Sequence, residues 1–144
     1  MSRVSSRGVF HFVSTFDYDK RKDGWKIISD TKDKAGDFIP KLVGFLKKGE
    51  DCIMGEEFLI RAIEMSDCAG QRQAEAMLRN QKDIPKDCRK HILVVAGTVW
   101  QNPQDGSRYV AYLYWGADNE WHLGFCLLKN DFRRNYRLIL VRPR

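Results

Sequence analysis

The chain begins with two stretches whose apolar residues have the two-residue period of β-strands. From Gly8 to Phe16, apolar side chains fall on both faces of an extended segment, and a shorter stretch runs from Trp25 to Ser29. The polar segment Asp17–Gly24 separates them and supplies a turn. The pattern therefore predicts an N-terminal β-hairpin. It leaves open whether this hairpin joins the sheet expected later in the chain.

The middle of the chain has the helical period, with apolar residues three and four positions apart. We expect helices at about Phe38–Lys48, Gly55–Ser66 and Arg72–Gln81. Asp37 can cap the first of them, and Gly49 can end it. This part of the chain therefore predicts a three-helix segment.

From His91 onward the period of strands returns. Turn-forming residues at 102–106 and 116–120 divide this part of the chain into short apolar runs. The expected strands are His91–Trp100, Arg108–Trp115, Trp121–Leu128 and Tyr136–Val141. Because neighbouring runs are joined by short turns, we predict a four-stranded antiparallel β-meander with the helices over one face. The predicted fold class is α+β, and the pattern does not determine the strand order.

Length and polarity favour one domain inside the cell. The 144 residues contain no repeat or linker, so we expect a single domain over residues 1–144. No apolar leader follows Met1, and the longest uncharged stretch, Ile92–Gln104, is too short to span a bilayer. We therefore expect a cytoplasmic protein that does not associate with a membrane.

The four cysteines lack the spacing of a metal site. Cys52, Cys68, Cys88 and Cys126 are scattered, and no two of them form a Cys-x-x-Cys pair. In a reducing compartment we expect free thiols, with neither a bound metal nor another cofactor.

The sequence contains none of three common catalytic motifs. These are the Gly-x-Ser-x-Gly elbow, a phosphate-binding glycine loop and the helical His-Glu-x-x-His pair. His122 and Cys126 share one strand face, but four residues of extended chain separate them by roughly 13 Å, too far for a hydrogen bond. The sequence thus favours a non-enzymatic protein. An enzyme whose site assembles from distant residues remains an alternative.

Aromatic and basic residues gather in the last third of the chain. The formal net charge is +6, and residues 129–144 hold six basic residues against one acid, Asp131. On the second strand of the expected meander, alternation places Arg108, Tyr112 and Tyr114 on one face. Exposed aromatic side chains often mark a surface that binds a macromolecule. The candidate binding residues are Arg108, Tyr112, Tyr114, Arg133, Arg134 and Arg137.

These residues predict a small interaction or regulatory module that binds a macromolecular partner through an aromatic and basic sheet face. A protein is the favoured partner. Aromatic rings beside basic groups also hold single-stranded nucleic acids, so nucleic-acid binding through the same surface is the alternative. The sequence determines neither the identity of the partner nor the oligomeric state.

Several short motifs are shared with other sequences. They are Gly55-Glu56-Glu57, Gln73-Ala74-Glu75, Gly97-Thr98-Val99-Trp100, Asp105-Gly106 and the ending from Arg137 to Arg144. Through these motifs, the chain from about Gly55 to Arg144 resembles a group of short uncharacterised bacterial proteins. The resemblance implies a self-contained bacterial domain, and it implies no activity, cofactor or catalytic residue.

Overall fold

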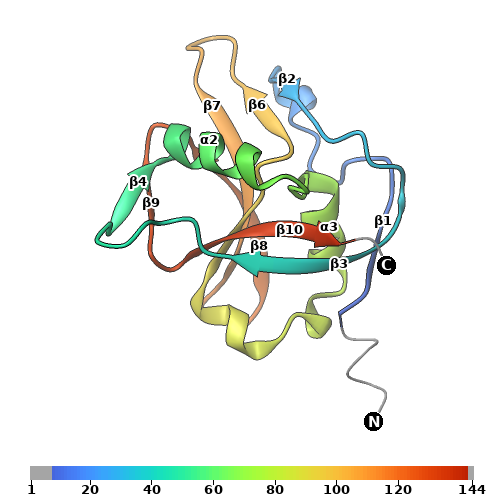
Figure 1. The fold of residues 1–144 in the computed structure, drawn as a ribbon. Helices are drawn as coiled ribbons and strands as arrows, with labels where there is room; N and C mark the ends of the chain where they lie inside the picture. Colours follow the sequence, from blue (N-terminus) through green and yellow to red (C-terminus); the bar gives the residue numbers. More distant parts are fainter. Residues whose placement is uncertain (1–7, 143–144) are drawn as a thin grey trace.

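The computed structural model describes residues 8–142, which fold into two α-helices and ten β-strands (Figure 1). The strands are β1 (Phe10–Phe12), β2 (Lys26–Ser29), β3 (Gly36–Val43), β4 (Cys52–Met54), β5 (Ile92–Val94), β6 (Val99–Gln101), β7 (Arg108–Trp115), β8 (Trp121–Leu127), β9 (Asp131–Arg133) and β10 (Tyr136–Arg142). The α-helices, labelled as in Figure 1, are α2 (Gly55–Met65) and α3 (Gln71–Arg79). Short 3₁₀ turns are η1 (Lys20–Asp23), η2 (Gln81–Asp83) and η3 (Lys86–Lys90).

Eight of the strands form one twisted sheet. Its order is β1-β3-β10-β5-β7-β6-β2, and β8 pairs with the other edge of β7. The short strands β5 and β6 pair with different halves of β7. β10 lies between β3, to which it is antiparallel, and β5, to which it is parallel. The remaining strands, β4 and β9, form a separate antiparallel pair.

The predicted meander is wrong because its last strand does not lie beside the strand that precedes it. β10 returns across the molecule to pair with β3 and β5 instead of extending the sheet from β8. This connection mixes parallel and antiparallel pairs in one sheet. The structure is a mixed α and β fold that is mostly sheet, with neither the three-helix segment nor the four-stranded meander.

The first predicted helix is also wrong, because residues 36–43 form strand β3. Phe38 of β3 pairs with Phe10 of β1, and Leu42 pairs with Ile139 of β10. The spacing of Phe38 and Leu42 fits a helix, but both partner strands lie far away in the sequence. Their backbone groups satisfy the hydrogen bonds that a helix would have formed internally.

The predicted N-terminal hairpin does not form either. β1 pairs with β3, whereas β2 pairs with β6, so the two strands belong to opposite ends of the sheet. The run that we expected to be one strand, His91–Trp100, is divided into β5 and β6. Between them, the N–H of Gly97 leaves the sheet and donates to the carbonyl of Ala69 (2.8 Å).

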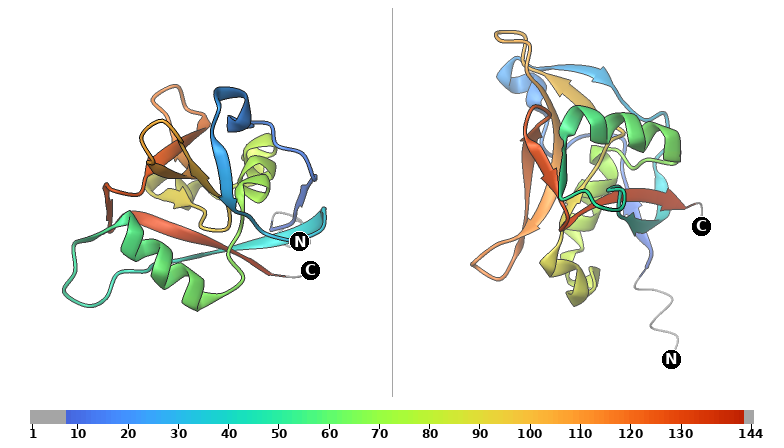
Figure 2. Two further views of the ribbon diagram at one scale, coloured as in Figure 1. Left: turned by 90° about the horizontal axis from the view of Figure 1, so that it is seen from above. Right: turned by 60° about the vertical axis from the view of Figure 1, so that its left-hand side comes forward.

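The two helices cover opposite faces of the sheet (Figure 2). Met77 of α3 belongs to the core cluster that contains Leu113 of β7. Phe58 of α2 belongs to a second cluster that contains Val110 of β7. Because side chains alternate along β7, its odd-numbered residues face α3 and its even-numbered residues face α2. This alternation decides which side chains reach the groove described below.

The polar side of α3 holds the N-terminal loop against the sheet. Glu75 is 1% exposed, and its carboxylate accepts hydrogen bonds from the backbone N–H groups of Asp17 (2.8 Å) and Tyr18 (2.9 Å). Gln71 donates to the carbonyl of Tyr18 (2.7 Å) and accepts from the indole N–H of Trp100 (2.6 Å). These buried polar groups are therefore paired with one another, as burial requires.

Candidate functional site

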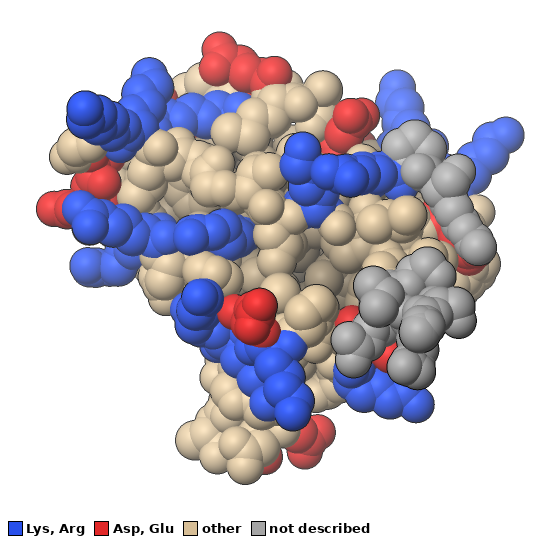
Figure 3. All heavy atoms as spheres, turned by 60° about the horizontal axis from the view of Figure 1, so that its bottom comes forward, with Lys and Arg blue, Asp and Glu red and all other residues tan. Residues whose placement is uncertain are grey.

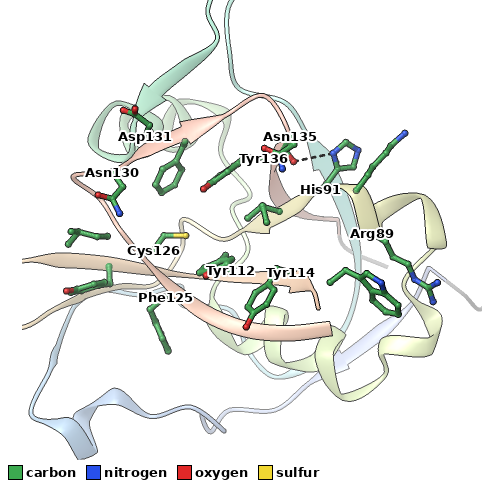
Figure 4. Close-up of a pocket in the computed structure, with 16 residues that line it drawn as sticks. Arg89, His91, Tyr112, Tyr114, Phe125, Cys126, Asn130, Asp131, Asn135 and Tyr136 are labelled. Atoms are coloured by element: carbon green, nitrogen blue, oxygen red, sulfur yellow. Dashed lines mark hydrogen bonds between the residues drawn. The ribbon is translucent and has the colours of Figure 1, made fainter. Parts of the chain in front are cut away.

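A groove of about 530 Å³ opens on the α2 side of β7 and β8 (Figure 4). Strand β8 borders one side, and the segment from Asn130 to Tyr136 arches over the other. Residues 89–92 close the end that lies to the right in Figure 4. Its volume is within the range of pockets that bind small molecules.

The floor of the groove is aromatic because β7 places two tyrosines there. Tyr112 and Tyr114 are two residues apart on the strand, and their ring centroids lie 5.5 Å from each other. Across the β7–β8 ladder, Tyr114 pairs with His122, and their rings stack at 5.4 Å. Tyr112 pairs with Gly124, which has no side chain, so the ring of Tyr112 lies over β8.

A third tyrosine faces this floor from the opposite wall. Tyr136 begins β10, and its ring packs at 5.2 Å from the buried ring of Phe132 on β9. Burial raises the pKa of both Tyr112 and Tyr136. Their phenols are therefore neutral at physiological pH and can donate hydrogen bonds to a ligand.

Basic side chains lie around the closed end of the groove. The Arg89 guanidinium lies 3.8 Å from the ring centroid of Trp115, and Lys90 beside it is exposed. Arg137 donates to the carbonyls of Arg134 (2.6 Å) and Tyr136 (2.8 Å). Within residues 8–142, the ion pairs involve neither Arg89 nor Lys90 nor Arg137. No carboxylate of the described residues therefore forms an ion pair with these three side chains.

The structure separates the arginines that the sequence predicted from the two tyrosines. Arg108 forms an ion pair with Glu56 in the first turn of α2, and Arg134 pairs with Asp51. Arg134 and Arg137 line a second hollow of about 540 Å³, and Tyr136 stands between this hollow and the groove. Arg133, on β9, is exposed. Of the six predicted residues, Tyr112 and Tyr114 therefore line the groove itself.

Other groove residues were not predicted. Cys126, Tyr136, His91 and Asn135 come from three separate parts of the chain. Tyr136 lies inside the basic segment 129–144, so its position in the sequence was a usable signal. No signal in the sequence indicates that β10 comes near β8, because this arrangement depends on the parallel pairing of β10 with β5.

The groove contains a histidine, a cysteine and a carboxylate, and within residues 8–142 no hydrogen bond joins any two of them. The Nδ1 atom of His91 is hydrogen-bonded to the backbone carbonyl of Asn135 (3.2 Å). Burial lowers the pKa of His91, and nearby Arg137 lowers it further. Burial raises the pKa of Cys126 to about 12, so its thiol is protonated at neutral pH. A protonated thiol is a poor nucleophile, and the arrangement gives no support to a cysteine enzyme.

The described residues also bear on metals and membranes. Among residues 8–142, no cluster of three or more His, Cys, Asp or Glu side chains is suited to hold a metal ion. Within the same range, neither α-helix has the length and apolar character needed to cross a bilayer.

Comparison with known proteins yields no match to a family model, a curated protein or a solved structure. The resemblance to short bacterial proteins therefore stays a prediction.

Proposed function

We propose that this chain is a non-enzymatic interaction module that binds an acidic segment of a partner protein in the tyrosine groove. The observation that carries the proposal is the combination of three tyrosines with basic side chains that form no ion pair within residues 8–142. Tyrosine and arginine are enriched at the energetic centres of protein interfaces. Here they converge on one concave surface from β7, η3 and β10.

Charge favours an acidic partner. Arg89 and Lys90 line the closed end of the groove, and Asp131 is the acid that lines it. Arg137 lines the second hollow and lies near His91 of the groove. The chain as a whole has a formal charge of +6. Figure 3 views the molecule with the lower side of Figure 1 brought forward, and Lys and Arg side chains cover more of that face than Asp and Glu. Such a surface attracts acidic partners and speeds their association.

Fluorescence anisotropy tests the proposal directly. Labelled peptides of about ten residues, rich in glutamate, valine and tyrosine, would be titrated with the protein at low salt. Versions with lysine in place of glutamate serve as the charge control. We expect the acidic peptides to bind and the basic ones not to bind. Equal affinity for both sets, or binding of neither, contradicts the proposed function.

Two variants locate the site. Tyr114→Ala removes part of the groove floor and should weaken peptide binding by about tenfold or more, as loss of an interface anchor does. Arg21→Ala is the matched control, because Arg21 is exposed on η1 and pairs locally with Asp19. If both variants bind as the wild type does, the groove is not the binding site.

Single-stranded nucleic acid is the second candidate, favoured by the stacked rings of Tyr114 and His122. Bases stack on such rings, and phosphates pair with nearby cations. Oligo(dT) of about fifteen nucleotides belongs in the same titrations. Tight binding that falls steeply between about 50 and 200 mM salt, with no binding of acidic peptides, would replace the protein partner with a nucleic acid.

A further inference from the structure

Strand β8 is an edge of the large sheet that lacks the usual protection. It pairs with β7 along its whole length and with no other strand among residues 8–142. Its sequence from Trp121 to Leu127 contains no Asp, Glu, Lys or Arg. Edge strands in soluble proteins are commonly kept from pairing with other chains by charges, prolines or bulges. β8 has a regular register with β7 and none of these devices.

The hydrogen-bond pattern shows which residues of β8 face outward. Leu128 donates to the carbonyl of Arg108 (2.9 Å), and Gly116 donates to the carbonyl of Glu120 (2.8 Å). These bonds mark the residue pairs of the antiparallel ladder that exchange backbone hydrogen bonds. By alternation, residues 122, 124 and 126 bond to β7, and residues 121, 123, 125 and 127 direct their backbone groups away from it.

The two ends of this outer edge are occupied, and its middle is not. The outward N–H of Trp121 donates to the side-chain carbonyl of Gln81 (2.9 Å). At the other end, the carbonyl of Leu127 accepts from the N–H of Asn130 (3.0 Å). Between them, no other described residue bonds to the outward backbone groups of Leu123 or Phe125. An unpaired donor and an unpaired acceptor at each of these residues form a template for one more strand.

We infer that the partner binds by strand addition: an extended acidic segment pairs with the outer edge of β8 at Leu123 and Phe125. The inference rests on the proposed function and specifies how that partner is held. Backbone hydrogen bonds would provide part of the affinity, and the alternating side chains of the added strand would provide specificity. One set of these alternating side chains would lie on the groove side of the sheet, where Gly124 leaves space for the ring of Tyr112.

The other set of side chains lies on the α3 side of the sheet. There, the ring of Phe125 packs against Trp25 (5.8 Å), and the Lys20 ammonium lies 4.5 Å from the centroid of the Trp25 ring. Lys20 also forms an ion pair with Asp23 (2.6 Å), whereas Lys90, on the groove side, is in none of the ion pairs of residues 8–142. The uncompensated basic charge beside the added strand therefore lies on the groove side. A second copy of this chain would bring another charge of +6 to the same edge, so an acidic partner is the better electrostatic match.

A pair of variants at one position isolates the backbone contribution. Leu123→Pro removes the outward N–H but leaves the ladder to β7, because residues 122 and 124 make those bonds. Leu123→Ala truncates the same side chain and keeps the N–H. The probe is a labelled peptide of about ten residues in which glutamate alternates with valine or tyrosine. We expect Leu123→Pro to weaken its binding by about tenfold or more relative to Leu123→Ala.

A second measurement does not depend on the folding of a variant. The wild-type protein is titrated with two N-methylated forms of the same peptide. One phase carries N-methyl groups on the odd-numbered backbone nitrogens, and the other phase carries them on the even-numbered ones. One phase should abolish binding and the other should spare it, because only one set of amides of an added strand faces β8. Hydrogen exchange should show protection of the amides of Leu123 and Phe125 when the unmodified peptide is bound.

The outcomes separate this inference from the proposed function. If the peptide binds, but Leu123→Pro equals Leu123→Ala and both N-methyl phases bind equally, strand addition is wrong and the interaction module stands. A second peptide has the same composition, but its glutamates are grouped together and do not alternate with valine or tyrosine. If it binds as well as the alternating peptide, binding as an added strand is again wrong. If no acidic peptide binds, the proposed function fails first. Light scattering that shows a dimer disrupted by Leu123→Pro would assign the edge to self-association instead.

Discussion

The ring of Tyr112 occupies the space that a side chain at Gly124 would take. A β-carbon on Gly124 would lie 2.9 Å from both Cε1 and Cζ of Tyr112. Real β-carbons do not approach other atoms so closely, so the two residues are matched across the β7–β8 ladder. The phenol thereby covers the middle of β8 and borders the groove at the same time.

The first prediction follows from this match. Gly124→Ala should displace the ring of Tyr112 and destabilise the fold by about 1–3 kcal/mol, the usual cost of overpacking. It should also weaken peptide binding in the groove. Gly44→Ala is the control, because a β-carbon at Gly44 would meet nothing within 4 Å. Urea unfolding measures the difference, and equal stability of the two variants would contradict the predicted overpacking.

The second prediction concerns the loop held by α3. Glu75→Ala leaves the backbone N–H groups of Asp17 and Tyr18 without their acceptor, which should cost about 2–4 kcal/mol. Glu64→Ala, at an exposed position on α2, should change stability little. Chemical unfolding compares the two variants, and hydrogen exchange shows whether the amides at 17 and 18 become exposed. A fully stable Glu75→Ala protein would contradict this role of the carboxylate.

The third prediction concerns acid stability. Arg61 forms ion pairs with Glu50 (2.7 Å) and Glu57 (3.0 Å), and its hydrogen bonds lower the pKa of Glu50 from 4.5 to about 2. Because the folded-state pKa is depressed, the contribution of Glu50 is present above pH 4.5 and is lost as the pH falls towards 2. Arg61→Met should therefore lower the melting temperature at neutral pH and flatten its decline in acid.

Arg89→Met provides the comparison for this measurement. Arg89 has no ion pair within residues 8–142, so its loss should leave the dependence of melting temperature on pH unchanged between about pH 5 and pH 2. Parallel curves for Arg61→Met and the wild type would show that Glu50 is not the group responsible.

The fourth prediction concerns the thiol in the groove. Burial raises the pKa of Cys126 to about 12, so it should react with iodoacetamide more slowly than the other cysteines at pH 7–8. Unfolding in urea should make all four cysteines react at similar rates. Mass spectrometry of the labelled peptides identifies each site. If Cys126 were the first cysteine labelled in the folded protein, the groove would hold an activated nucleophile and the enzyme alternative would return.

The sequence predicted best where the decisive contacts are local. Helical periodicity located α2 and α3 to within a few residues, and alternation placed Tyr112 and Tyr114 on one face of β7. The helix predicted at Phe38–Lys48 was wrong because β3 pairs with β1 and β10, from the two ends of the chain. This pairing outweighs the local helical period. The same limit applies to the site. No local pattern shows that Arg108 is bound by Glu56, or that Tyr136 lies opposite Tyr112.

The position of β10 has a consequence for how the chain folds during synthesis. β10 follows every other described element in the sequence, yet it is the strand that joins the β1–β3 pair to β5. Until β10 leaves the ribosome, β3 has no partner on that side, and its apolar residues remain open to chaperones and proteases. The large sheet can therefore close only after translation of residues 136–142, and ribosomes stalled before that point should carry a protease-sensitive N-terminal half.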